Sequence, residues 1–314
     1  MEIKSERLQP SAAPLSLATR PSRQYLPLLI LIAAFLAAAA IPLILGTDNS
    51  AASSDARAYH IPQINTFMTR PFDLLRYPAS SATTPGYHIL LAWIMDLLGY
   101  AAVDENTLPF KLINLAIGCT PVLLAWLIAS RLSGLPWRAA ALAAPVAGSS
   151  YVISGASFGT TDNGAFAFYA LALFLLIFHR RAAFALAATL AGAVAWRQIY
   201  FPIAGTVALS VVDDPWRRPL TQLLQPRRLA RAVAICLPAI VLLAAWAINW
   251  GGLVPPEFRK TNGASYSGAV IVQALALTGL YALAFALPAS ALAGAFDLKT
   301  WRRIAIVSLA ARRT

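Results

Sequence analysis

Long apolar runs alternate with short polar segments along most of this 314-residue chain. The first run, residues 25–45, is long enough to cross a bilayer, which takes about 20 apolar residues. Helices satisfy their own backbone hydrogen bonds in hydrocarbon, so the pattern predicts an all-α polytopic membrane protein. Further spans are expected at 108–130, 138–153, 165–178, 182–212 as a hairpin, 232–250 and 267–294.

The composition excludes an ordinary soluble domain. Hydrophobic residues make up 59% of the chain, charged residues only 12%, and the mean hydropathy is +0.64, whereas globular proteins carry about 25% charged residues. The net charge of +12 comes from basic clusters between apolar runs, which is typical of cytoplasmic loops and not of a nucleic-acid surface. Cys119 and Cys236 both lie in apolar runs, which indicates core residues and neither a disulfide framework nor a metal site.

The charge pattern divides the chain into three parts. Residues 1–24 are polar and predict a disordered cytoplasmic tail. Residues 25–294 form the expected transmembrane domain, in which 46–107 is a first loop on the outer face. Residues 295–314 form a basic cytoplasmic end, at which the chain looks truncated.

Two segments of the first loop predict helices on the membrane surface. Residues 58–69 place apolar side chains at near-helical spacing with polar residues between them, as in an amphipathic interfacial helix. Residues 87–102 are short for a span and contain Asp96, so either a span or a second interfacial helix fits. The positions of the arginine clusters favour the interfacial helix. A span there would move every later loop to the opposite side of the membrane and place most arginines outside.

Polar residues that do not simply anchor a span collect on the outer face in this topology. Arg197 is the most informative, because a charge within an apolar run is costly unless it faces a cavity or an anion. The alternative is an interfacial arginine that snorkels to water. The residues that share this face are Asp55, His60, Gln63, Asp73, Thr83, Thr84, His88, Asp162, Asn163, Arg197, Gln198, Lys260, Thr261 and Asn262.

Five short motifs follow one another between residues 55 and 263. They are YHIPQ at 59–63, SATTPGYHILL at 81–91, GTTDNGAFAF at 159–168, WRQIY at 196–200 and RKTNG at 259–263. In this order they resemble motifs of the dolichyl-phosphoglucose-dependent α-1,2-glucosyltransferases, a family of the GT-C superfamily. The chain departs from the family pattern at Asp55, where Ala56 and Arg57 follow in place of an acidic pair.

The resemblance implies a GT-C-type bundle of about eight transmembrane helices and transfer of a glucose-like hexose from a polyprenyl-phosphate donor on the outer face. Asp55 is then expected to act as the base, His60 to orient the acceptor or Asp55, and Arg197 with Lys260 to hold the phosphate. Further substrate contacts are expected from Gln63, Thr83, Thr84, His88, Asp162, Asn163, Gln198 and Asn262. No cofactor is expected, although Asp55 and Asp162 could instead hold a divalent metal ion.

Two other functions fit the same polar pattern. One is a polytopic carrier or flippase for a lipid-linked saccharide, and the other is an inactive scaffold fragment. For the enzyme, the expected partners are the polyprenyl-phosphate sugar, a glycan or lipid-linked acceptor and membrane lipids, with no nucleic acid. The expected location is a bacterial inner membrane with the site facing the periplasm, or the endoplasmic reticulum membrane in a eukaryote.

Overall fold

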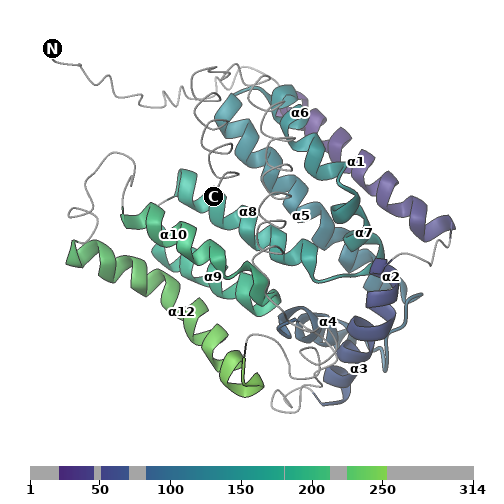
Figure 1. Ribbon diagram of the computed structural model, residues 1–314. Coiled ribbons are helices and arrows are strands. Elements are labelled where there is room, and N and C mark those ends of the chain that lie inside the picture. The colour runs from purple at the N-terminus through teal and green to yellow at the C-terminus, as the bar shows by residue number, and fades with distance from the viewer. Residues whose placement is uncertain (1–20, 46–50, 71–82, 180, 213–224, 253–314) are drawn as a thin grey trace, which may run out of the picture.

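The computed structural model describes residues 21–45, 51–70, 83–179, 181–212 and 225–252 (Figure 1). Every regular element in these ranges is a helix, so the all-α prediction is confirmed for this part of the chain. Several segments singled out in the sequence lie outside the described residues, namely Asp73, Lys260, Thr261, Asn262 and the expected span at 267–294.

Within the described residues, three helices are long and apolar enough to cross a membrane: α1 (Pro21–Leu45), α5 (Leu108–Ser133) and α12 (Pro226–Trp250). A fourth span results if α6 (Pro136–Ala147) and α7 (Ser150–Phe158) are counted as one broken helix. The chain is therefore a membrane-associated helical protein. The expected number of about eight spans is not reached within the described residues.

The break between α6 and α7 corrects the expected continuous span at 138–153. The two helices meet at an angle of 66°. Pro145 has no N–H to donate to the carbonyl of Ala141, which weakens the last turn of α6. Ser149 is extended, so α7 starts as a separate helix after Gly148. Hydropathy alone does not detect this bend, because the residues on both sides of it are apolar.

The expected hairpin at 182–212 is present as two short helices. α9 (Ala183–Trp196) and α10 (Pro202–Val212) are joined through the 3₁₀ turn η3 (Gln198–Tyr200). The preceding helix, α8 (Asp162–Phe178), begins three residues before the predicted start at 165. At 11 to 17 residues, these helices are shorter than a typical span.

The described part of the first loop forms four helical segments, α2 (Ala51–Asp55), the π-helical turn η1 (Ala56–His60), α3 (Ile61–Thr69) and α4 (Gly86–Leu97). α4 has 12 residues, which is shorter than a candidate span, and Asp96 is exposed.

The apolar face of α3 corrects the expected helix on the lipid surface. Ile61, Ile64 and Phe67 are buried in one cluster with Tyr87 and Leu91 of α4. Asn65 fixes the next loop in place, because its amide donates to the carbonyl of Val103 at 2.9 Å and accepts from the same residue's N–H at 2.7 Å. The first loop therefore packs on the protein through this face.

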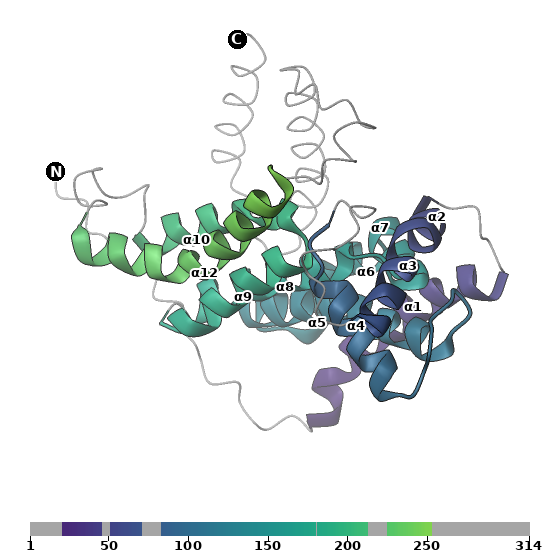
Figure 2. The ribbon, with the colours of Figure 1, turned by 90° about the horizontal axis from the view of Figure 1, so that it is seen from below.

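Neighbouring long helices run antiparallel, so the first loop and the basic residues between the spans, such as Arg131 and Arg138, lie at opposite ends of the bundle (Figure 1). α5 packs against α1, α6, α7 and α8, and α9 packs against both α8 and α12. At the basic end, Arg131 of α5 lies 3.2 Å from His179 after α8 and stacks over Phe174. Figures 1 and 2 show α2, α3 and α4 together at the other end.

Cysteine labelling in sealed membranes tests this arrangement. With Cys119 and Cys236 replaced by alanine, the Asn106→Cys variant is expected to react with an impermeant thiol reagent from outside, because Asn106 is exposed at the polar end. Arg138→Cys, exposed at the basic end, is expected to react only after permeabilisation. Labelling of both variants in intact membranes would contradict the topology.

Candidate functional site

A polar cluster lies inside the apolar core at the end of the bundle that carries the first loop. The surrounding core includes Ile64 of α3, Tyr87 of α4, Phe110 of α5, Trp196 of α9 and Trp250 of α12. Five elements that are distant in sequence thus meet around this cluster. Buried polar groups at such a junction must be paired, or they cost free energy.

His60 and His88 form a buried pair at the centre of the cluster. Nδ1 of His60 lies 2.9 Å from Nε2 of His88, and the rings are stacked with their centroids 5.2 Å apart. The N–H of Ile61 bonds to the carbonyl of Ala56, five residues back, and Pro62 has no N–H to restore the α-helical ladder. This wider turn carries His60 towards α4.

The histidine pair is neutral at pH 7. Burial, together with the positive charge of Arg197, lowers the pKa of His60 from 6.5 to about 4. Each neutral ring carries one proton, and one of these two protons lies between the rings. In either tautomer, one of the two remaining ring nitrogens is a donor and the other is an acceptor.

Tyr87 connects the histidines to α5 and to the turn before α8. Its ring packs edge-on against His60 and His88, and its hydroxyl lies 2.8 Å from Oδ1 of Asn114 and 2.9 Å from the carbonyl of Gly159. Gly159 has a φ of +72°, and a Cβ there would lie 2.6 Å from the ring of Phe110. Glycine is therefore needed at this turn for both conformation and space.

Thr84 and Gln198 hold the start of α4 against the end of α9. The hydroxyl of Thr84 donates to the carbonyl of Val194 at 2.6 Å, and its N–H donates to Oε1 of Gln198 at 3.0 Å. A Cβ at Gly86 would lie 2.5 Å from the carbonyl oxygen of Ala195, so the two backbones approach closely. These contacts give Thr84 and Gln198 a structural role beside the expected substrate contacts.

Asp162 and Arg197 form an ion pair between the first turn of α8 and the end of α9. Their side chains are 15% and 28% exposed, so the pair lies mostly inside the protein. The N-terminal end of a helix favours a carboxylate, which supports Asp162 in its charged form. The guanidinium of Arg197 is thus engaged within the protein, which argues against the snorkelling alternative.

Three buried polar atoms on residues next to Asp162 and Arg197 in the sequence have no hydrogen-bond partner within the part of the chain that the structure describes. They are Oγ1 of Thr161, Oδ1 of Asn163 and Nε1 of Trp196. Asn163 uses its other amide atom, Nδ2, to donate to the carbonyl of Val152 at 2.8 Å. Buried polar atoms are paired in the great majority of cases, so these atoms favour a polar ligand at this position.

Most of the predicted site residues that lie within the described part of the chain come together in the structure. Gln63 and Thr83 are also buried, on α3 and just before α4. Asp55 is different, because it is exposed on α2 and has no hydrogen bond or ion pair to another described residue. No three His, Cys, Asp or Glu side chains gather as metal ligands among the described residues. The members that meet in the cluster are His60, Thr84, His88, Asp162, Arg197 and Gln198. The amide of Asn163 lies instead between α5 and α7, where it bonds to Val152.

Sequence reasoning did not single out Tyr87, Asn114 or Trp196 as site residues. Asn114 could have been predicted as a site residue, because it is a lone amide within the apolar run 108–130. Tyr87 lies in a quoted motif, but an aromatic side chain beside a Pro-Gly turn is as typical of a core as of a site.

No protein-family model, curated protein or solved structure matches the chain. The likeness to the glucosyltransferases therefore rests on the short motifs alone.

Two helical glycines test the packing of the site. A Cβ at Gly164 in α8 would overlap the indole of Trp196, whereas a Cβ at Gly205 in α10 has nothing within 4 Å among the described residues. Gly164→Ala is expected to destabilise the protein by about 1–3 kcal/mol, and Gly205→Ala to be neutral or stabilising. Thermal unfolding in detergent measures both changes. Equal melting temperatures for the two variants would contradict the described contact.

Proposed function

We propose that the chain is a membrane glycosyltransferase that moves a glucose-like hexose from a polyprenyl-phosphate carrier to an acceptor. The observation that carries this proposal is the Asp162–Arg197 ion pair, set in an apolar bundle, with unpaired buried polar atoms on residues next to it in the sequence. An arginine in such surroundings suits an anionic substrate. The five family-like motifs give the proposal its sugar and its carrier.

The donor phosphate takes the place of the Asp162 carboxylate on Arg197. A guanidinium presents two parallel N–H groups, which bind a phosphate as well as they bind a carboxylate. The acceptor hydroxyl oxygen then bonds to the anomeric carbon while the bond from that carbon to the phosphate oxygen breaks. The electron pair leaves with the polyprenyl phosphate, whose added negative charge Arg197 stabilises.

The exchange on Arg197 also provides the base. When phosphate occupies the guanidinium, the Asp162 carboxylate is released and accepts the proton of the attacking hydroxyl. We favour Asp162 over Asp55, because Asp162 lies within the polar cluster and Asp55 is exposed outside it. A neutral ring nitrogen of His60 or His88 orients the acceptor.

Steady-state kinetics with a labelled polyprenyl-phosphate hexose test these roles. Asp162→Asn is expected to lower kcat roughly 10²-fold or more, as for loss of a general base. The KM for the donor should stay constant or fall, because the competing carboxylate is removed. Arg197→Gln is expected to raise the donor KM and lower kcat together, since it contacts phosphate in both ground and transition states.

Two further carboxylates serve as controls for the charge change. Asp96→Asn removes an exposed carboxylate from α4 and is expected to leave both constants unchanged. Asp55→Asn tests the base predicted from the sequence, for comparison with Asp162, the base favoured here. Loss of turnover in Asp55→Asn with normal turnover in Asp162→Asn would return the base to Asp55. Unchanged kinetics in every variant would contradict the proposed site.

A further inference from the structure

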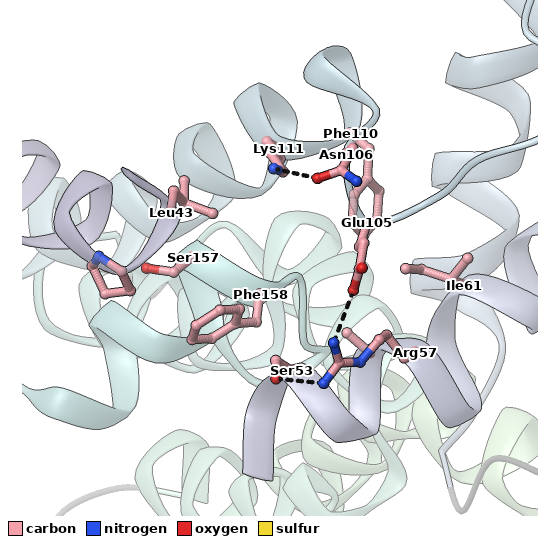
Figure 3. A pocket seen from close by; sticks show the side chains of 12 residues that line it. Leu43, Ser53, Arg57, Ile61, Glu105, Asn106, Phe110, Lys111, Ser157 and Phe158 are labelled. Carbon is pink, nitrogen blue, oxygen red and sulfur yellow. Dashed lines mark hydrogen bonds and ion pairs between the residues drawn. The ribbon is translucent and has the colours of Figure 1, made fainter. Parts of the chain in front are cut away.

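A pocket lies where the described part of the first loop meets the ends of the long helices. Its volume is about 100 Å³, comparable to roughly three water molecules in the liquid. Figure 3 shows the side chains that line it, which come from α1, α2, η1, α3, α5, α7 and the loop before α5. Drug-sized ligands need roughly 300–1,000 Å³, so this pocket suits one small polar group.

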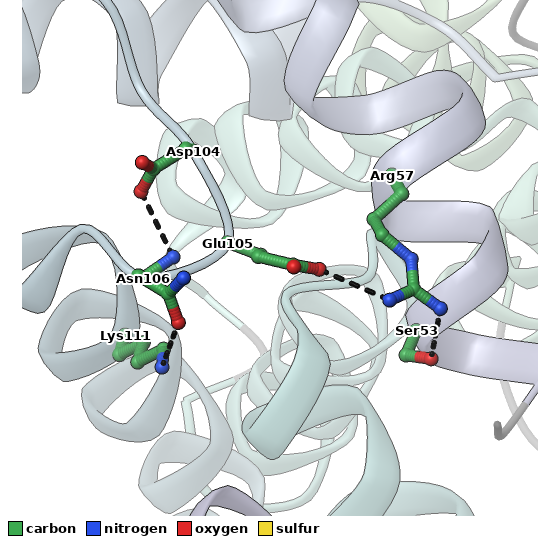
Figure 4. Close-up of polar contacts among 6 residues, drawn as sticks. All are labelled: Ser53, Arg57, Asp104, Glu105, Asn106 and Lys111. Carbon is green, nitrogen blue, oxygen red and sulfur yellow. Dashed lines mark hydrogen bonds and ion pairs between the residues drawn. The ribbon is translucent and has the colours of Figure 1, made fainter. Parts of the chain in front are cut away.

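The charged wall of the pocket is held by weak, exchangeable contacts. Nη1 of Arg57 lies 3.2 Å from Oε2 of Glu105, and Nη2 of Arg57 lies 3.3 Å from Oγ of Ser53 (Figure 4). Nζ of Lys111 lies 3.4 Å from Oδ1 of Asn106, a long distance for a hydrogen bond. The side chains of Arg57 and Glu105 are 40% and 43% exposed, and ion pairs of this kind contribute little stability.

The lining carries a net positive charge. The lining residues include two cations, Arg57 and Lys111, and one carboxylate, Glu105. The neighbouring carboxylate of Asp104 is occupied in its own turn, where it accepts from the hydroxyl of Thr107 at 2.8 Å and the N–H of Asn106 at 2.9 Å. An anion that enters the pocket therefore meets two cationic side chains and competes with the Glu105 carboxylate for Arg57.

Apolar side chains from candidate membrane helices also line the pocket. Leu43 lies in the last turn of α1, Phe110 in the first turn of α5 and Phe158 at the end of α7. The ends of spans lie at the level of lipid headgroups. Cationic side chains beside an apolar wall at this level match a lipid phosphate with its chains against the helices.

We propose that this pocket binds the phosphate headgroup of an anionic phospholipid. Arg57 and Lys111 contact the phosphate, and Glu105 swings off Arg57 when the lipid binds. The site is separate from the one proposed for sugar transfer, because Arg57 and His60 lie on the same turn but contact different partners, Glu105 and His88. The inference therefore stands independently of the proposed function.

Binding of fluorescent phosphatidylglycerol to the full chain in detergent tests the proposal. The Arg57→Gln and Lys111→Gln double variant is expected to bind at least tenfold more weakly. Glu105→Gln is expected to bind more tightly, because it removes the carboxylate that competes with the phosphate. Arg70→Gln is the matched control and is expected to bind normally, since Arg70 is an exposed arginine in the same loop outside the pocket.

The Glu105→Gln variant distinguishes loss of the site from misfolding, because a misfolded protein would not bind the lipid more tightly. Equal weakening in the double variant and in Arg70→Gln would show general surface charge and overturn the site. Weaker lipid binding by Glu105→Gln would show that the ion pair between Arg57 and Glu105 is purely structural, and this result would also overturn the proposed site. Two competitors identify the source of the phosphate. Competition by glycerol phosphate at equal concentration would overturn the lipid assignment, as would equal affinity for phosphatidylcholine.

Discussion

The cost of a charge inside an apolar helical bundle explains how this molecule is arranged. Arg197 lies at the end of an apolar helix, and Asp162 begins the neighbouring one, so each charge is placed where the other can neutralise it. The antiparallel path of α8 and α9 brings the two residues to the same end. The histidine pair, which stays neutral beside Arg197, fits the same constraint.

The buried polar groups around this ion pair divide into two kinds. Tyr87, Asn114 and Thr84 have their hydrogen bonds satisfied within the protein, and they fix the first loop on α5, α8 and α9. Thr161 and Asn163 instead retain buried atoms without partners among the described residues. A rigid frame around a few unsatisfied groups is the arrangement that binding and catalysis need.

Much of the fold followed from apolar length and charge, because both are local properties of the chain. The helices, the hairpin and the grouping of His60, Asp162 and Arg197 were predictable in this way. The bend at Gly148 was not, because a proline near the end of an apolar run leaves its hydropathy unchanged. The burial of the α3 face was also missed, since periodicity shows that a face is apolar but not what covers it.

The fate of the labelled sugar of the donor tests the central proposal most directly. The full chain would be placed in vesicles with a polyprenyl-phosphate hexose labelled in the sugar, together with an acceptor on the side of the first loop. Enzymatic transfer predicts that the label moves to the acceptor while one polyprenyl phosphate is released for each hexose transferred. Appearance of intact donor in the opposite leaflet, without labelled product, would contradict the account and identify a carrier.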